Sequence, residues 1–223
     1  MIANHIRLCV AALMAVIGAF GSFPTLGAGQ LRPDDDTPSR TIKNIGERLA
    51  ALGPYRVSFT AGSEDMEPAS GEYVVDGDRF SVGLAGSRLI SDGVSLWHID
   101  GTNMEVTVDA ADPQSRNILV NPAGAFDFGE DSFRSEDAGE DFFGDRMCRT
   151  IRLTPVRDIS GMAGSVMLYV DMATGLPAGL RYVMDDDTLT VTVTSITPAE
   201  NPEPSVFVFD PDDYPDYEII DFR

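Results

Sequence analysis

Apolar and polar residues alternate along most of the chain after residue 54, which is typical of β-strands. Tyr55, Val57 and Phe59, for example, are separated by more polar residues. Short turn signals such as Asp76-Gly77-Asp78 divide the alternating segments, and this arrangement predicts an antiparallel meander of about ten strands. The segments expected to form strands are 55–60, 71–75, 79–84, 88–91, 94–99, 104–108, 147–153, 165–171, 180–184, 189–196 and 205–209.

The hairpin expected at 89–100 carries apolar residues on both of its faces. Asp92-Gly93 is a tight-turn dipeptide. In the strand that follows it, Trp97 and Ile99 share one face, and Leu96 lies on the other. A sheet with one face in water does not need apolar residues on both faces. The pattern therefore favours a sheet that covers apolar material on each side.

One helix is predicted at 38–52. Thr37 is a suitable N-cap, and Pro38 suits the first helical position. Ile42, Ile45, Leu49 and Leu52 form one apolar stripe at helical spacing, and Gly53-Pro54 ends the helix.

Two further segments are less regular. Residues 117–128 fit a short helix or loop with an apolar underside, and the acidic segment 130–141 is expected to be an irregular connection. The strands carry more large apolar side chains than one short helix covers. Such a sheet either closes on itself or keeps a cavity of ligand size.

Residues 1–29 are interpreted as a signal peptide. Arg7 precedes an apolar run at 10–20, and small residues follow at Gly27, Ala28 and Gly29. The run is short for a bilayer span, although an uncleaved membrane anchor remains the alternative. Residues 30–223 have a length that suits a single domain.

The composition is strongly acidic, with 36 Asp and Glu against 16 Lys and Arg and a net charge of −20. Nucleic acid and anionic membrane surfaces repel such a protein on average, so no nucleic-acid partner is expected. The charge also fits a role in solubility alone. Cys148 lies in an alternating segment and is expected to be a small buried apolar residue.

The sequence offers little for catalysis. Beyond the leader His98 is the only histidine, and it lies in a predicted strand beside Trp97. No nucleophile, phosphate-binding or dinucleotide motif is present, and too few His and Cys residues remain for a metal site built on them. We therefore expect no enzyme, no catalytic residue, no cofactor and no metal. A hydrolase with two distant carboxylates stays open as a minor alternative.

Several segments resemble the LolA family of periplasmic lipoprotein carriers. They are 71–80 (GEYVVDGDRF), 90–97 (ISDGVSLW), the turn 171–177 (DMATGLP) and the closing 209–223 (FDPDDYPDYEIIDFR). The resemblance implies a mainly β fold: a curved, unclosed antiparallel half-barrel with a helical lid over its concave face. The segments 38–52 and 117–128 are the candidates for that lid.

The resemblance also implies a function. A carrier of this family binds the acyl chains of lipoproteins released by an inner-membrane exporter and delivers them to an outer-membrane acceptor. A monomer in the periplasm is expected. The alternatives are a binding module for a free lipid or glycolipid and, less favoured, the hydrolase. Phe80 matches the family's phenylalanine at a strand end, and Trp97 matches its hairpin tryptophan. The residues expected to bind lipid are Phe59, Tyr73, Phe80, Trp97, Ile99 and Phe126.

The chain departs from the family where Lys-Arg-Pro precedes the strand-end phenylalanine. Here the segment reads Asp76-Gly77-Asp78-Arg79. The family's lid-closing arginine therefore has no direct counterpart, and Arg79 and Arg88 are the alternatives for its role.

Overall fold

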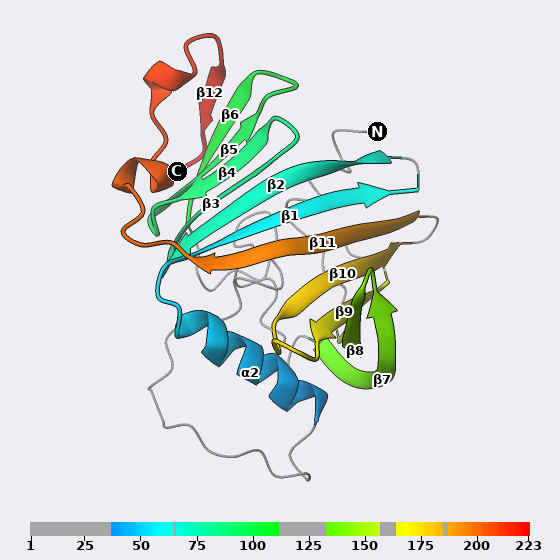
Figure 1. Ribbon diagram of the computed structural model, residues 1–223. Coiled ribbons are helices and arrows are strands. Elements are labelled where there is room, and N and C mark those ends of the chain that lie inside the picture. The colour runs from blue at the N-terminus through cyan, green and yellow to red at the C-terminus, as the bar shows by residue number, and fades with distance from the viewer. Residues whose placement is uncertain (1–36, 65, 112–132, 157–163, 185–186) are drawn as a thin grey trace.

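The structure is a computed structural model that describes residues 37–64, 66–111, 133–156, 164–184 and 187–223. Within them, one long curved sheet carries a single α-helix, α2, beneath one of its faces (Figure 1). The elements are α2 (Pro38–Ala50), β1 (Tyr55–Ser63), β2 (Met66–Asp76), β3 (Arg79–Leu84), β4 (Ser87–Ser91), β5 (Ser95–Asp100), β6 (Glu105–Ala110), β7 (Phe133–Phe143), β8 (Arg146–Pro155), β9 (Ser165–Asp171), β10 (Pro177–Met184), β11 (Asp187–Pro198), the 3₁₀ turns η3 (Pro204–Phe207) and η4 (Pro211–Asp213), and β12 (Glu218–Asp221).

The sheet has 12 strands in the order β12-β6-β5-β4-β3-β2-β1-β11-β10-β9-β8-β7. The ends of this order, β12 and β7, are not joined to each other, so the sheet is unclosed. Neighbouring strands are antiparallel except for β12, which pairs with β6 in parallel. The expected curved, unclosed, mainly β architecture is confirmed, with twelve strands in place of about ten.

The acidic segment expected to be irregular is largely the edge strand β7. Its residues between Phe133 and Phe143 are mostly exposed on both faces, so they show no apolar alternation. The strand is held by its ladder with β8, in which Glu136 lies opposite Arg152 and Glu140 opposite Arg149. Opposite charges at facing positions support a sheet without an apolar pattern.

The segment expected to form a strand at 205–209 instead begins as the 3₁₀ turn η3. Pro204 occupies the start of η3, where its fixed φ suits a helical turn. Phe207 is fully buried at the end of this turn. Phe207 and Phe209 thus pack on the sheet and do not extend it. The predicted signal peptide 1–29 and the predicted insert 117–128 lie outside the described residues.

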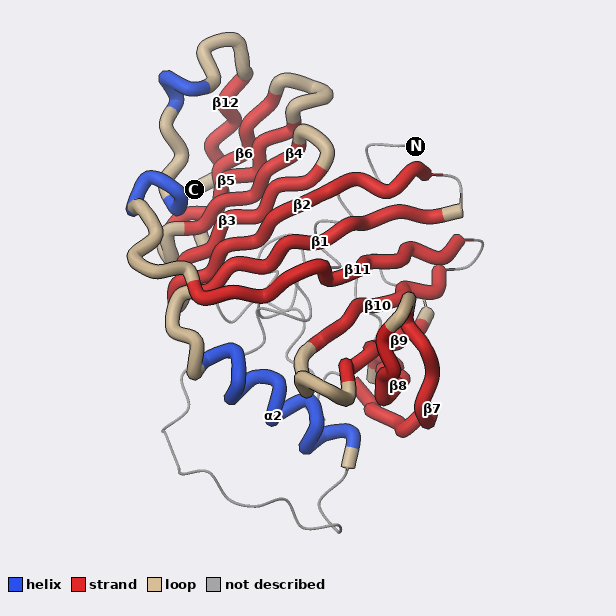
Figure 2. Tube along the Cα trace, viewed as in Figure 1, coloured by secondary structure: helices blue, strands red, loops and turns tan. Residues whose placement is uncertain are grey.

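At the hairpin 89–100 both faces of the sheet are covered, as its apolar residues on both sides indicated. On one face, which we call the inner face, α2 packs in a large apolar cluster with residues from β1 to β5 and β7 to β11. On the outer face, the C-terminal segment 204–217 packs over β3 to β6 through Phe209, Tyr214 and Tyr217. Figure 2 shows the two coverings as separate layers, with α2 and the C-terminal turns on different parts of the sheet.

The helix forms where its local signals predicted. Thr37 has extended backbone angles, and its side chain accepts a bond from the Arg40 amide at 3.4 Å. Pro38 occupies the first turn, where no amide donor is needed. Ile42, Ile45 and Leu49 are buried on the side that faces the sheet. The helix therefore owes its position to one apolar stripe.

Gly71 in β2 makes room for the ring of Phe59 on the inner face. The two residues are paired in the β1–β2 ladder. A methyl group at Gly71 would overlap the Phe59 ring and lie 2.8 Å from the carbonyl oxygen of Gly83. We expect Gly71→Ala to lower the free energy of unfolding by about 1–3 kcal/mol, as overpacking does, in urea titration.

Gly83→Ala is the matched control, because nothing lies within 4 Å of a methyl group at that position on the adjacent strand. Equal unfolding midpoints for Gly71→Ala and Gly83→Ala would contradict the packing of Phe59 on Gly71.

Candidate functional site

Three of the six residues expected to bind lipid lie together on the inner face. Phe59, Tyr73 and Phe80 come from the neighbouring strands β1, β2 and β3. All three are buried in the same apolar cluster as α2. The rings of Tyr73 and Phe80 are 6.2 Å apart between centroids and tilted by 56°. The sequence thus identified the centre of an aromatic wall under the helix.

The cluster under the helix consists of uncharged side chains, and the buried carboxyl group of Asp100 lies on the same face at the end of β5. Burial raises the pKa of Tyr73 and of Tyr55 well above the usual value, so both hydroxyls stay neutral at ordinary pH. The other members are aliphatic or aromatic, which makes the wall suitable for apolar ligands. The buried wall residues contributed by the sheet are Tyr55, Val57, Phe59, Ala61, Tyr73, Phe80, Val82, Leu84, Leu89, Leu96, Phe133, Ile151, Leu153, Val166, Leu168, Val170, Leu180, Tyr182, Leu189, Val191 and Val193.

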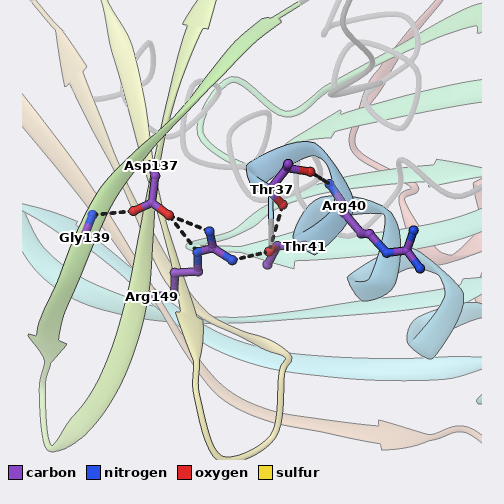
Figure 3. Close-up of polar contacts among 6 residues, drawn as sticks. All are labelled: Thr37, Arg40, Thr41, Asp137, Gly139 and Arg149. Atoms are coloured by element: carbon purple, nitrogen blue, oxygen red, sulfur yellow. Dashed lines mark hydrogen bonds and ion pairs between the residues drawn. The ribbon is translucent and has the colours of Figure 1, made fainter. Parts of the chain in front are cut away.

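Near its N-terminus, α2 is tied to β7 and β8 by polar contacts (Figure 3). Arg149 of β8 donates one bond to Thr41 Oγ1 at 2.9 Å. It donates two more to Asp137 Oδ2 of β7, at 3.1 and 2.5 Å. Two residues earlier in the helix, Ser39 Oγ lies 3.2 Å from Ser135 Oγ. A strand arginine therefore links the helix to the edge of the sheet.

Arg149 stabilises the charged form of the Asp137 carboxyl group. The bonds from Arg149, together with one from the Gly139 amide, lower the pKa of its carboxyl group. A carboxyl group with a lowered pKa gives stability that is present above its unfolded pKa and is lost as the pH falls through the folded value. The Arg149–Asp137 pair is therefore intact at neutral pH.

A second contact holds the C-terminal half of the helix. Arg48 Nη1 donates to the carbonyl oxygen of Thr174 at 2.6 Å. Thr174 lies in the turn between β9 and β10, and Asp171 shapes this turn by accepting a bond from the Ala173 amide at 2.7 Å. The guanidinium group of Arg48 also lies against Gly175. Each of these three contacts of α2 therefore uses a hydroxyl group or a backbone carbonyl oxygen as the acceptor.

The other expected lipid-binding residues are not part of this wall. Trp97 and Ile99 lie on the outer face, in a cluster with the C-terminal segment. The rings of Trp97 and Phe209 stack at 6.4 Å. Alternation assigned the two residues to one face but could not show that this face is opposite to Phe80. Phe126 lies outside the described residues.

The two arginines considered for lid closure also point to the outer face. Arg79 forms an ion pair with Asp76, and its guanidinium carbon lies 4.9 Å from the ring centroid of Phe207. Arg88 donates to Ser81 Oγ at 3.1 Å. Arg149 and Arg48 hold the helix instead. The contacts of these two arginines join residues more than a hundred positions apart, so no local signal could reveal them.

Groups that could carry chemistry are sparse in the described part of the chain. No group of three or more His, Cys, Asp or Glu side chains suited to a metal ion occurs there. Cys148 is buried, as expected, and burial raises the pKa of its thiol. A thiol with a raised pKa is a poor nucleophile. The same residues contain no helix long and apolar enough to span a membrane.

Comparison with known proteins finds no matching family model and no match among curated proteins. Among solved structures, an uncharacterized conserved protein from Thermus thermophilus matches with a TM-score of 0.57 and 10% identity, over 82% of this chain and 98% of the other. A LolA superfamily protein from Nitrosomonas europaea matches at 0.36 and 12% identity, over 75% and 97%. A putative outer membrane lipoprotein-sorting protein domain from Vibrio parahaemolyticus matches at 0.40 and 9%, over 74% and 94%.

At such identities a structural match shows a common fold and leaves the function open. The TM-score of the Thermus protein supports a shared fold over most of both chains. The LolA superfamily protein and the sorting domain match less well and carry no inference about this chain. The comparisons thus establish a fold shared with the Thermus protein, and the resemblance to the LolA family rests on the sequence segments given above.

The tie between Arg149 and the helix yields a test. Arg149→Met removes the bond to Thr41, worth about 1 kcal/mol, while its length preserves most of the packing. We expect the backbone amides of 38–50 to exchange hydrogen about fivefold faster, measured by mass spectrometry.

Arg152→Met is the control, because Arg152 lies on the same strand but on its other face, where its side chain is exposed. If the two variants exchange α2 amides at equal rates, Arg149 does not hold the helix.

Proposed function

We propose that this protein is a periplasmic carrier that holds the acyl chains of lipoproteins between the inner face of its sheet and α2. One observation carries the proposal: within the described residues, an amphipathic helix packs its apolar stripe into a large apolar cluster on the inner face, and polar contacts at Thr41 and Arg48 hold its two halves. Opening such a helix exposes a surface that suits fatty chains and little else.

The energies of helix and cargo are comparable. Burying an Ile or Leu side chain is worth about 1.5–3 kcal/mol, so the stripe of Ile42, Ile45 and Leu49 contributes roughly 5–9 kcal/mol. An acyl chain of about sixteen carbons gains roughly 12 kcal/mol on leaving water. Exchanging the helix stripe for a chain is therefore favourable by roughly 3–7 kcal/mol. A carrier needs such a moderate balance, because it must also release its cargo.

The proposed cycle has no covalent step. An inner-membrane exporter presents the lipoprotein, α2 swings away from the wall, and the acyl chains take the place of its apolar stripe. The strong negative charge keeps the loaded carrier off anionic membrane surfaces while it diffuses. An outer-membrane acceptor with a deeper apolar site then removes the chains. Secretion through the predicted signal peptide 1–29 is part of this proposal.

The material bound in cells tests the identity of the cargo. We expect the protein, purified from the periplasm without detergent, to carry acylated proteins that mass spectrometry identifies by their lipid-modified N-terminal cysteine. A preparation that contains only free lipid or glycolipid would support the alternative binding module and refute the lipoprotein carrier.

A disulfide lock tests whether the helix must move. Ser39 Oγ and Ser135 Oγ are 3.2 Å apart, which suits replacement by a disulfide after small adjustments. We expect the double variant Ser39→Cys, Ser135→Cys to lose the binding of a fluorescent acyl probe when oxidised and to regain it when reduced. The locked helix cannot leave the wall.

Each single variant, Ser39→Cys or Ser135→Cys, is a matched control and should bind the probe under both conditions. Cys148 is buried and does not compete for the new bond. If the oxidised double variant binds the probe as well as the reduced one, the cargo does not lie under α2.

A further inference from the structure

A row of exposed apolar side chains crosses one end of the sheet next to its free edge. Phe142 of β7 and Met147 of β8 are directly paired across the two strands. Met172 follows β9, and its amide donates to the carbonyl oxygen of Met147 at 3.1 Å. These side chains are 59%, 41% and 53% exposed, respectively. We call Phe142, Met147 and Met172 the apolar row.

The apolar row lies on the inner face, at positions that α2 does not cover. Met147, Arg149 and Ile151 alternate along β8 and therefore share one face. Ile151 is buried in the cluster with α2, and Arg149 binds the helix. Two positions further along, Met147 is open to solvent. Adjacent exposed apolar side chains of this size are typical of interaction surfaces.

The strand edge beside the row is able to pair. Within the described residues, β7 has a neighbour on one side only. The carbonyl of Met147 points toward the β9 side, so Phe142 and Met147 form a pair without mutual backbone bonds, and the backbone of Phe142 faces the open edge. The Phe142 amide donates to the carboxylate of Asp141 at 2.8 Å, a contact that an incoming strand can replace.

The charges around the apolar row determine which kind of partner can bind there. Glu140, Asp141 and Asp145 are exposed near the end of this hairpin. The two arginines nearest the row make other contacts: Arg146 donates to the carbonyl oxygens of Ala178 and Val193, and Arg149 is bound to Asp137. The exposed Arg134 and Arg152 lie toward the other end of the hairpin. The exposed rim is therefore acidic and disfavours anionic lipid headgroups.

We propose that the free edge of β7 and the apolar row bind an extended segment of a partner protein, in which apolar side chains alternate with Lys or Arg. The segment adds a strand to the sheet, its apolar side chains cover the apolar row, and its cations meet the acidic rim. Met172 begins the turn that presents the Thr174 carbonyl to Arg48, so the partner docks beside one of the ties to α2.

A designed peptide tests the surface without knowledge of the partner. The probe is a fluorescent peptide that alternates Lys and Val, and its binding to the delipidated full-length secreted protein is followed by polarisation. We expect the Lys–Val peptide to bind and a peptide of equal length that alternates Glu and Val not to bind. Methylation of the backbone amides along one edge of the Lys–Val peptide should abolish binding, because a methylated amide cannot join the sheet.

Two sets of variants locate the site. Phe142→Ser with Met147→Ser should weaken binding about tenfold, whereas Val183→Ser, which removes an apolar side chain that is 44% exposed on β10, should not. Glu140→Lys with Asp145→Lys should reverse the preference toward the Glu–Val peptide. Equal binding of the methylated peptide, or no effect of either double variant, would overturn the proposal. A loss of acyl-probe binding in Phe142→Ser with Met147→Ser, with peptide binding intact, would assign the row to the cargo instead.

These measurements do not depend on the cargo. Failure of the peptide to bind leaves the carrier function standing, and failure of the disulfide lock leaves the edge of β7 as a docking site.

Discussion

The structure depends on one constraint: an unclosed sheet with apolar residues on both faces must have both faces covered. The outer face is covered by chain that is also built into the sheet. After Phe209, Tyr214 and Tyr217 the chain continues into β12, where the Glu218 and Phe222 amides donate to carbonyl oxygens of β6 and its approach. On the inner face, α2 adds no strand to the sheet and is held by side chains. The two coverings therefore differ in how easily they can leave.

Much of the fold follows from short-range patterns. The bounds of the helix follow from local signals between Thr37 and Gly53. The β2–β3 hairpin and the β4–β5 hairpin likewise follow from alternation around Asp76-Gly77-Asp78 and Asp92-Gly93. The sequence pattern does not predict β7 as a strand, for a physical reason. An edge strand that is exposed on both faces has no apolar period, and its ion pair from Asp137 to Arg149 of β8 joins residues that only the ladder brings together.

Only part of the arrangement of residues around α2 is predictable from the sequence, for a related reason. A period of two assigns side chains to two faces but does not say which face meets the helix. Alternation alone therefore leaves Phe80 and Trp97 in one expected lipid-binding site, although they lie on opposite faces of the sheet. The contacts of Arg149 and Arg48 are set by the curvature of the whole sheet, which no single segment encodes. The aromatic residues Phe59, Tyr73 and Phe80 of the wall are predictable from the sequence because they are large and recur at strand spacing. It missed the polar ties because each is a single side chain.

The chemistry of those ties is what allows the cover to move. Breaking a buried ion pair by removing one partner costs about 3–5 kcal/mol, because a charge is left uncompensated. Three of the contacts across the helix boundary instead have a neutral partner: the Thr41 hydroxyl, the Ser39 hydroxyl and the Thr174 carbonyl. When α2 leaves, Arg149 keeps its bonds to Asp137, and Arg48 travels with the helix into water. The Arg149–Asp137 ion pair therefore survives opening, and the apolar stripe, which is the part that an acyl chain replaces, contributes to the cost of opening.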